Sequence, residues 1–338
     1  MTFSEPPIER ARRELPAALL ERLEAICPPD RWATVVSSFA EPPAVHARAN
    51  PLAGDAKATW EELRTNGLVG EATEVPGALR FDPKQRAALL ETEAWGTGRL
   101  FLQGLGSQLA AHALAPEPGE RVLDLCAAPG AKTSLLWALM EGSGELVAND
   151  QSRGRAYKLE ALLDQLKADG VQVRCRAGES YGRTDPAGFD RVMCDVPCSA
   201  EARLHVDVPK LISEYRPGEA KRLAPRQERL LASAVRAVRP GGVVLYATCT
   251  LNRTENERVV ERILKRSRAG KLPPVELEPL PFRPTSATPG VDEHGAPVPE
   301  LAEFARLWPD AQTEGFCLAR FRRLEGSDPD DPNRATRP

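Results

Sequence analysis

Short apolar runs alternate with stretches of helical periodicity through the middle of this 338-residue chain, and this alternation restricts the fold most strongly. The runs that predict strands lie at 121–126, 145–149, 171–174, 191–194 and 243–248. The stretches that predict helices lie at 133–140, 153–169, 226–239 and 254–266, the last with Thr254 as its expected N-cap. Strands that alternate with helices of this length predict a mostly parallel sheet covered on both faces, and therefore an α/β fold.

The two ends of the chain do not continue this alternation. The first ninety-odd residues predict one amphipathic helix at 8–26, a short segment at 45–52 and a helix near 55–66. We expect an α+β subdomain over 1–95, the main domain over 96–325 and a flexible tail over 326–338. Prolines concentrated at 273–299 predict an extended surface connection, because proline interrupts helices and central strands. Residues 316–324 predict a late edge strand.

Composition excludes several classes of protein. Hydrophobic residues make up 42% of the chain and charged residues 28%, which is enough apolar side chain for a sizeable core. The seven cysteines are odd in number and scattered, so we expect reduced thiols in a cytoplasmic protein. The N-terminus has charges and prolines where a signal peptide needs an apolar run, and no membrane-spanning run follows. The net charge of −3 does not by itself indicate a nucleic-acid partner.

The sequence CAAPGAK at 126–132 joins a predicted strand to a predicted helix. A glycine in such a turn lets the backbone approach a ligand, and the helix start offers free amides. The sequence is neither GxGxxG nor a phosphate loop, so an ordinary turn is an equally good interpretation. Asp150 ends the next predicted strand, where an acid accepts hydrogen bonds from ribose hydroxyls, although it also suits a helix N-cap. Together these features predict a nucleoside cofactor and leave NAD and S-adenosylmethionine open.

Two cysteines follow two other predicted strands. Asp195 and Cys198 lie in DVPC at the end of one, and Cys249 lies in TCT at the end of another. Functional groups gather outside the carboxyl ends of strands in an open α/β sheet, so these side chains share one small volume if the strands are neighbours. A lone cysteine is more often an inert core residue. A structural zinc site is disfavoured because Cys194 and Cys198 lack a matching ligand pair.

Two thiols and a carboxylate beside a methyl donor suit one reaction in particular. Carbon 5 of cytosine is a poor nucleophile, but a thiolate that adds to carbon 6 converts the ring into an enamine. A carboxylate can hydrogen-bond the N3 and N4 edge of the ring and stabilise this adduct. A second thiol can then remove the proton at carbon 5, so that the first thiol leaves.

Four segments resemble the Nop/Sun family of RNA cytosine-C5 methyltransferases: VLDLCAAPGAKT at 122–133, AND at 148–150, DVPCS at 195–199 and YATCTLNRTENE at 246–257. The resemblance covers nearly the whole chain, since RAN at 48–50, FLQ at 101–103, Gln227 and PGG at 240–242 also match. It implies a Rossmann-like class I methyltransferase domain with a mostly parallel seven-stranded sheet, preceded by a small α+β subdomain of RNA-binding type. It also implies S-adenosylmethionine as cofactor and carbon 5 of an RNA cytosine as methyl acceptor.

The resemblance assigns roles by position. It makes Cys249 the nucleophile, Cys198 the thiol that assists product release, Asp195 a cytosine contact and Lys132 a group near the reacting atoms. The cofactor-binding residues that it implies are Cys126, Ala127, Ala128, Pro129, Gly130, Ala131, Lys132, Asp150, Arg155, Glu179 and Asp195. We expect no metal, no membrane partner and a monomer. We expect rRNA as the substrate because the chain lacks the extra RNA modules of some relatives, with tRNA as the alternative.

Three positions depart from the pattern of the family. Glu179 stands where the family usually has an aspartate near the adenine, and Ala131 replaces a frequent glycine. The segment QGLGS at 103–107 replaces a commoner Gln-Asp/Asn-x-Ser-Ser sequence. None of these changes removes a reacting group, so we expect an active enzyme.

An RNA substrate must be reconciled with the slightly negative net charge. Between Arg203 and Arg229 the chain has seven basic residues against four acidic ones, directly after the DVPCS segment where a substrate backbone would pass. An ordinary solvated surface of mixed charge is an equally good interpretation. The target cytosine must be unpaired or flipped, because a base stacked in a helix is out of reach.

Four other functions compete with this prediction. A NAD-dependent oxidoreductase shares the fold, but it does not explain two cysteines at strand ends. An amino-group methyltransferase typically has an aromatic residue where Cys198 stands. A DNA cytosine methyltransferase exchanges the roles of Cys198 and Cys249. A non-catalytic RNA-binding protein remains as the last alternative, against which the presence of Asp195 and both thiols argues.

Overall fold

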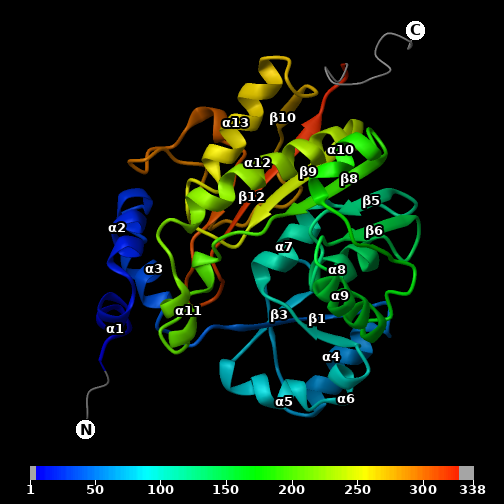
Figure 1. The fold of residues 1–338 in the computed structure, drawn as a ribbon. Coiled ribbons are helices and arrows are strands. Elements are labelled where there is room, and N and C mark those ends of the chain that lie inside the picture. The colour runs from blue at the N-terminus through cyan, green and yellow to red at the C-terminus, as the bar shows by residue number, and fades with distance from the viewer. Residues whose placement is uncertain (1–4, 327–338) are drawn as a thin grey trace.

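A computed structural model describes residues 5–326 of the chain. Two β-sheets dominate it: a four-stranded sheet in the order β2-β3-β1-β4 and an eight-stranded sheet in the order β10-β12-β9-β8-β5-β6-β7, with β11 paired to β12. The smaller sheet lies at the bottom of Figure 1, and the larger sheet runs through the upper half. A separate group of three helices, shown in blue, lies at the left.

The smaller sheet is entirely antiparallel. Its strands are β1 (Val45–Ala49), β2 (Glu71–Ala72), β3 (Ala78–Phe81) and β4 (Leu100–Leu102), and its helices are α4 (Ala56–Thr65), α5 (Arg86–Leu90) and α6 (Glu93–Gly96). The helix predicted near 55–66 is confirmed as α4. It begins after Asp55, because the Asp55 carboxylate caps it by accepting a 2.7 Å hydrogen bond from the Ala58 amide. The sheet reaches β4, beyond the expected boundary at residue 95, and the division of the chain into domains stays a prediction.

Arg48 and Asn50, on and directly after β1, connect the smaller sheet to the rest of the molecule. The buried Arg48 guanidinium donates to Gln103 Oε1 and to Ser134 Oγ, each at 2.8 Å. The Asn50 amide donates to the backbone carbonyls of Gly98 at 3.0 Å and Leu166 at 2.8 Å. The RAN segment is therefore a structural joint between the two sheets.

The three N-terminal helices are α1 (Pro7–Glu14), α2 (Ala17–Ile26) and α3 (Trp32–Ser38). The prediction of one continuous helix at 8–26 is wrong, because Leu15 and Pro16 leave the helical conformation and separate α1 from α2. Leu15 is extended, with ψ of 149°, since a proline disfavours the helical conformation of the residue before it. The apolar faces of these helices pack against Ala202, Leu204 and Val206, in the segment that follows β8.

The larger sheet has a parallel body and an antiparallel edge. Its parallel strands are β5 (Arg121–Asp124), β6 (Glu145–Asn149), β7 (Gln172–Arg174), β8 (Phe189–Asp195) and β9 (Val238–Thr248). The strands β10 (Val275–Leu277), β11 (Ala305–Leu307) and β12 (Phe316–Arg323) are antiparallel. The predicted α/β fold with a mostly parallel Rossmann-like sheet is confirmed. The sheet has eight strands and not the expected seven, because β11 pairs with β12 outside the main row of strands.

Helices cover both faces of this sheet (Figure 1). One face carries α7 (Leu105–Leu114), α8 (Ala131–Leu139) and α9 (Arg153–Gln165), and the other carries α10 (Tyr181–Thr184), α12 (Glu219–Ala237) and α13 (Glu257–Arg268), while α11 (Pro209–Glu214) lies beside the N-terminal helices. Successive residues of each strand point to opposite faces, so Val122 belongs to the core under α7 and Leu123 to the core under α12. Within residues 5–326, no helix combines the length and apolar character needed to cross a membrane.

Three local predictions differ from the structure. The strand at 316–323 is not an edge strand, because β10 pairs with its outer side. The proline-rich segment at 273–299 supplies β10 before it continues as an irregular connection. Thr254 is not the N-cap of α13, because residues 253–256 form turns and Asn256 takes the cap position. The tail predicted over 326–338 lies outside the described residues except for Gly326.

Candidate active site

The carboxyl ends of β8 and β9 bring the two predicted cysteines together. These strands pair in parallel with Asp195 opposite Ala247, so the condition that they be neighbours is met. The loops that leave them place Cys198 Sγ 3.4 Å from Cys249 Sγ, although 51 residues separate the two in the chain. Both thiols are half-buried, and neither is part of a disulfide.

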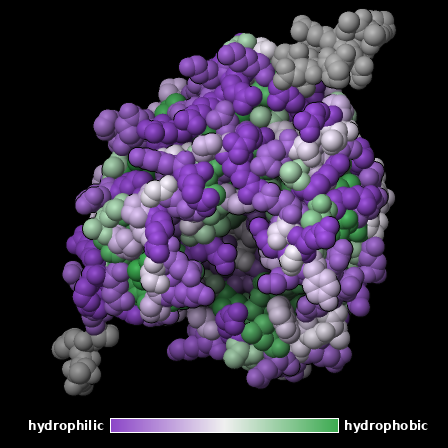
Figure 2. Space-filling view, in the orientation of Figure 1, coloured by the Kyte–Doolittle hydropathy of each residue, from purple (hydrophilic) through white to green (hydrophobic). Residues whose placement is uncertain are grey.

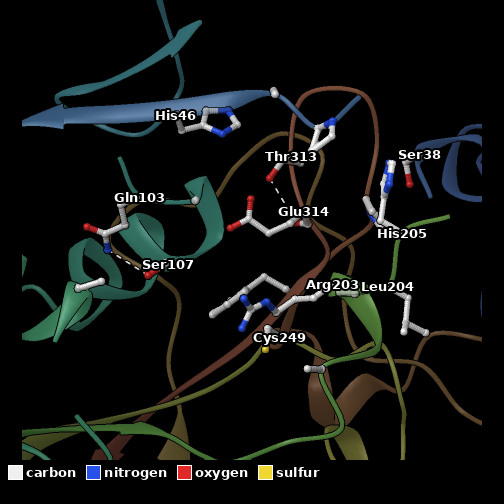
Figure 3. Close-up of a pocket in the computed structure, with 18 of the residues that line it drawn as sticks. Ser38, His46, Gln103, Ser107, Arg203, Leu204, His205, Cys249, Thr313 and Glu314 are labelled. Carbon is white, nitrogen blue, oxygen red and sulfur yellow. Dashed lines mark hydrogen bonds between the residues drawn. The ribbon is translucent and has the colours of Figure 1, made fainter. Parts of the chain in front are cut away.

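A cavity of about 910 Å³ opens over this pair of thiols. Besides Asp195 to Cys198 and Cys249, its lining comes from five parts of the chain and from Arg155 of α9. The five parts are residues 38–46, residues 102–107, residues 126–132, residues 200–208 and residues 309–316. Figure 2 shows a hollow in this face of the molecule, between a largely hydrophilic rim and a hydrophobic patch below it. In Figure 3, Gln103 and Ser107 line one side, and Arg203 reaches over Cys249 from the other. The cavity therefore lies between the large sheet, the small sheet and the N-terminal helices.

The two thiols differ in their electrostatic surroundings. The hydrogen bond with Cys198 lowers the pKa of Cys249, and the positive charges of Lys132 and Arg203 lower it further, against burial and the negative charge of Asp195. The same hydrogen bond, burial and the Glu255 carboxylate hold the pKa of Cys198 well above its usual value. Since only the thiolate is a nucleophile, this asymmetry favours Cys249 as the attacking group.

Lys132 and Asp195 form an ion pair beside the thiols. Lys132 Nζ lies 2.8 Å from Asp195 Oδ2 and 5.3 Å from the centre of the Phe316 ring. Burial alone would lower the pKa of Lys132, but the Asp195 carboxylate raises it above its usual value. Lys132 is therefore charged at neutral pH, and it fixes one oxygen of Asp195, a residue that lines the cavity.

A buried network holds the loop that carries Cys198. Glu255 accepts hydrogen bonds from the Ser199 amide at 2.9 Å and from Gln227 Nε2 at 2.8 Å, and it also pairs with the Ser199 hydroxyl. Gln227 donates a second hydrogen bond to the Pro197 carbonyl at 2.9 Å. Ser199 Oγ lies 2.9 Å from Thr250 Oγ1, which joins this loop to the one that follows Cys249.

A second buried network holds the chain after Cys249. Asn256 accepts a hydrogen bond from Thr248 Oγ1 at 2.6 Å and donates to the Thr250 carbonyl at 2.9 Å. The guanidinium of Arg306, which is completely buried, donates to the Leu251 carbonyl at 2.8 Å and to Glu257 Oε2 at 2.7 Å. Thr248 to Glu257 thus form a closed, hydrogen-bonded turn that contains Cys249.

The loop at 126–132 forms the floor of the cavity on the side of α8. Gly130 has φ of +116°, a conformation that favours glycine, and a side chain there would approach Leu159 Cδ1 to 2.8 Å. The Ala127 amide donates to the Asn149 carbonyl at 2.7 Å, and Arg155 Nη2 donates to the Ala128 carbonyl at 2.6 Å. The structure therefore brings Arg155 to this loop, as the sequence predicts.

Asp150 follows β6 and is buried. Its Oδ1 accepts a hydrogen bond from the Ser152 amide at 2.9 Å, and its Oδ2 lies 3.3 Å from Arg155 Nη2. Asp150 is not the N-cap of α9, because Ser152 takes that position, and the Asp150 carboxylate instead accepts from the Ser152 amide. The contact of Asp150 with a ribose stays a prediction.

The remaining candidates divide into two groups. Among the predicted cofactor residues, those that line the cavity are Cys126, Ala128, Pro129, Ala131, Lys132, Arg155 and Asp195. Of the residues that the structure describes, Ala127, Gly130, Asp150 and Glu179 are not part of that lining. Glu179 Oε1 accepts a 3.0 Å hydrogen bond from Arg226 Nε, so an ion pair with α12 already occupies one of its oxygens. The adenine contact of Glu179 stays a prediction.

Sequence reasoning missed several residues of the site. Asp124 ends β5 and is completely buried, which raises its pKa to about 7, and its Oδ1 has no hydrogen-bond partner in the described part of the chain. Its place at the carboxyl end of a strand was a usable signal, since the same rule identified Asp150 and Asp195. His46 and Glu314 also line the cavity, and no sequence pattern indicates them because they arrive from distant segments.

Comparison with known proteins gives the family of the sequence. A family model described as 16S rRNA methyltransferase RsmB/F matches residues 111–322. The chain is 34% identical over 229 residues to ribosomal RNA small subunit methyltransferase F of Serratia proteamaculans, covering 67% of this chain and 45% of that protein. It is 33% identical over 224 residues to human tRNA (cytosine(72)-C(5))-methyltransferase NSUN6, covering 63% of this chain and 45% of that protein. The chain spans about half the length of these curated relatives.

Solved structures agree with the fold over nearly the whole chain. A methyltransferase homologue from Pyrococcus horikoshii superimposes with a TM-score of 0.77 and 25% identity, covering 95% of this chain and 100% of that one. NSun6 from the same organism, crystallised with the ligand SFG, gives a TM-score of 0.78 at 21% identity, covering 93% of this chain and 99% of that one. The arrangement of both sheets is therefore shared with these proteins.

Proposed function

Because the chain belongs to the family described as 16S rRNA methyltransferase RsmB/F, we propose that it transfers a methyl group from S-adenosylmethionine to carbon 5 of a cytosine in RNA. Family membership agrees with the resemblance to the Nop/Sun family found in the sequence. The observation that carries the proposal is the 3.4 Å contact between Cys198 and Cys249 beside the ion pair of Lys132 and Asp195. A NAD-dependent oxidoreductase has no use for such a pair of thiols.

The residues around the loop at 126–132 suit a nucleoside bearing an amino acid. The buried Asp124 Oδ1 has no partner among the described residues, and Asp150 offers a second carboxylate close by. Carboxylates accept hydrogen bonds from ribose hydroxyls and from an ammonium group. We assign Cys126–Lys132, Asp150 and Arg155 to holding S-adenosylmethionine, with Glu179 at the adenine end. When bound, this cofactor supplies a methyl group on a positively charged sulfur.

Cys249 is the nucleophile in this proposal. Its thiolate adds to carbon 6 of the cytosine, and the electron pair of the C5–C6 double bond moves towards N3, which makes carbon 5 nucleophilic. The lowered pKa of Cys249 and the neighbouring charge of Lys132 increase the population of thiolate at neutral pH. The buried turn at 248–257 keeps the sulfur in place, so little ordering is needed when the base arrives.

Asp195 and Lys132 act on the other edge of the ring. Asp195 accepts a hydrogen bond from the exocyclic amine of the cytosine, while the ion pair with Lys132 holds the carboxylate in its orientation. Uracil presents a carbonyl at this place, which a carboxylate repels, so the pair also selects cytosine over uracil. RNA with uridine in place of the target cytosine should therefore be a poor substrate.

Cys198 assists the release of the product. After methyl transfer, a base takes the proton at carbon 5, the electrons of that bond restore the C5–C6 double bond, and the pair of the carbon–sulfur bond returns to Cys249. Cys198 lies 3.4 Å from Cys249 and is therefore within reach of the same ring. Its raised pKa makes its thiolate a stronger base than that of Cys249.

The substrate that we favour is ribosomal RNA. The family description and the Serratia relative both name rRNA, whereas the human relative names tRNA, which we keep as the second candidate. The target base must leave its stack to reach a cavity of this depth. We expect a reducing, cytoplasmic compartment, because oxidation would join two thiols that are only 3.4 Å apart. We also expect a monomer.

Bisulfite sequencing of total RNA, with and without the gene, tests the proposed function. We expect one cytosine that resists conversion only when the gene is present, and re-introduction of a Cys249→Ala gene should not restore the resistance. A protected site in rRNA supports the main proposal, and one in tRNA selects the alternative. Identical conversion patterns in both cell lines, together with no transfer of labelled methyl groups to either RNA in vitro, would refute it.

A further inference from the structure

Arg203 projects into the cavity beside the nucleophile. It ends the short 3-10 helix at 201–203, directly after the loop of Cys198. The backbone holds this helix in place, since the Ala202 amide donates to the Cys249 carbonyl at 3.3 Å and the Arg203 amide donates to the Ala200 carbonyl at 2.9 Å. Figure 3 shows the guanidinium of Arg203 extended over Cys249, from the wall opposite Gln103 and Ser107.

The Arg203 guanidinium has no polar partner within the part of the chain that the structure describes. Within residues 5–326, the side chain of Arg203 makes neither an ion pair nor a hydrogen bond, whereas Arg155 pairs with Asp150 and Arg226 with Glu179. One of the acids that line the cavity, Glu314, extends between His46 and Ser107 in Figure 3 rather than towards Arg203. An arginine that is fixed at its backbone, unpaired at its head and aimed into a substrate cavity is suited to bind a ligand oxygen.

We propose that Arg203 is a catalytic residue that binds the O2 carbonyl of the target cytosine and stabilises the negative charge that forms there. The inference rests on the proposed function and adds a residue to it. When the Cys249 sulfur bonds to carbon 6, the C5–C6 electron pair moves to C4–C5, and the C4–N3 pair moves onto N3 and is shared with O2. Asp195 binds the exocyclic amino group of the cytosine, so the O2 carbonyl is the acceptor that still needs a hydrogen-bond donor.

The position of Arg203 agrees with this assignment, in which Asp195 binds the amino group of the cytosine and Arg203 binds O2. Carbon 6 and carbon 2 are both bonded to N1, so a cation beside the sulfur that attacks carbon 6 can reach the oxygen on carbon 2. Asp195 and Lys132 form the β8 and α8 side of the site, and Arg203 approaches from the side of the N-terminal helices. Donors aimed at the site where charge develops increase a rate by about 10²–10³-fold.

Arg203 also has an effect that can be measured without RNA. The charged and titratable groups that act on Cys249 are Cys198 from the β8 loop, Asp195 from β8, Lys132 from α8 and Arg203 itself. The cation of Arg203 lowers the pKa of Cys249, so its removal should raise that pKa. Because Arg203 is exposed, the change should be small, about two- to threefold in thiolate population at pH 7.

The test compares Arg203→Met and Arg203→Lys in the full chain, with Arg258→Met as the matched control on the exposed face of α13. Single-turnover methyl transfer should fall by about 10²-fold in Arg203→Met and by about tenfold in Arg203→Lys, because lysine keeps the charge but loses the planar fork. RNA affinity should change by less than about threefold. Alkylation of Cys249 by iodoacetamide, followed by mass spectrometry against pH, should shift to higher pH in Arg203→Met alone.

A modified substrate distinguishes O2 from a phosphate. RNA with 2-thiocytosine at the target should react slowly with the wild-type enzyme, and the same modification should add little to the defect of Arg203→Met. Weaker RNA binding with a lower salt dependence and an unchanged rate would instead identify a phosphate contact and overturn the inference. An unchanged rate would overturn it as well. Failure of the wild-type enzyme on every RNA would refute the proposed function, while alkylation would still report on Arg203 and Cys249.

Discussion

The loops of Cys249 and Cys198 carry the same side chain and are supported in different ways. The chain after Cys249 is closed by Asn256 and by the ion pair of Arg306 and Glu257, in which both side chains are 0% exposed. The chain after Cys198 runs to the wall of the cavity. There Arg22 Nη2 of α2 lies 2.6 Å from Glu201 Oε1, and the Arg22 side chain is 24% exposed. One loop closes on itself inside the core, and the other, although buried contacts hold its start, continues to the wall of the cavity.

Under the proposed function, this difference suits the two thiols to two different roles. The hydrogen bond between the two thiols lowers the pKa of Cys249 and raises that of Cys198. The cations near Cys249 and the Glu255 carboxylate near Cys198 add to these two changes. A thiol with a lowered pKa in a rigid turn is suited to attack, whereas a thiol with a raised pKa beside a substrate wall is suited to move a proton. Substitutions in the two loops should therefore give different defects, not merely different degrees of one defect.

The largest effect should follow Cys249→Ala. Without the sulfur no adduct forms at carbon 6, and carbon 5 stays unreactive, so methyl transfer should fall by about 10⁴-fold or more. Incorporation of labelled methyl groups into RNA measures the loss. Cys175→Ala is the matched control, because Cys175 is the exposed cysteine outside the cavity among the described residues. Substantial methylation by the Cys249 variant would remove the basis of the comparison.

Cys198→Ala should block a later step. Adduct formation and methyl transfer continue, but the proton at carbon 5 is removed slowly, so release should fall by about 10²–10⁴-fold. A covalent complex of protein and RNA should then accumulate as a slower band on a denaturing gel. If the band appeared in the Cys249 variant and was absent from the Cys198 variant, the two roles would have to be exchanged.

Glu255→Ala should weaken the connection between the loops. The Ser199 amide and Gln227 would lose their buried acceptor, which should lower the free energy of unfolding by about 2–4 kcal/mol and slow release by about tenfold. Denaturant unfolding and the decay of the adduct measure the two effects. Glu255→Gln keeps an acceptor oxygen and should recover most of the stability. Equal stability of the alanine variant and the wild type would show that this network is dispensable.

Arg22→Met should have the smallest effect. It leaves the buried Glu201 carboxylate without its cation, and because Arg22 is partly exposed the cost should be about 1–2 kcal/mol. Methyl transfer should change by less than about threefold, since neither sulfur is touched. Arg12→Met, at an exposed position of α1, is the control for thermal unfolding. A loss of activity comparable to that of Glu255→Ala would mean that the N-terminal helices position Cys198 directly.

Much of the larger sheet could be predicted because its strands are buried on both faces and read as apolar runs. The prediction was correct for β6 to the residue and for β5, β7 and β8 within two residues, whereas β9 begins at Val238, five residues before the predicted start. The errors arose where distant contacts decide. Residues 316–323 look like an edge strand until β10 pairs with them, and nothing near 8–26 except Pro16 separates α1 from α2.

Local pattern alone determined that this chain alternates strands and helices, and that Asp150, Asp195, Cys198 and Cys249 follow strand ends. These properties are local because side-chain periodicity and turn chemistry act over a few residues. Only the tertiary structure decided that β8 and β9 are neighbours, that the two sulfurs lie 3.4 Å apart, and that Arg203 is left unpaired in the described chain. Contacts across 51 residues depend on how the sheet packs, which no short window of sequence contains.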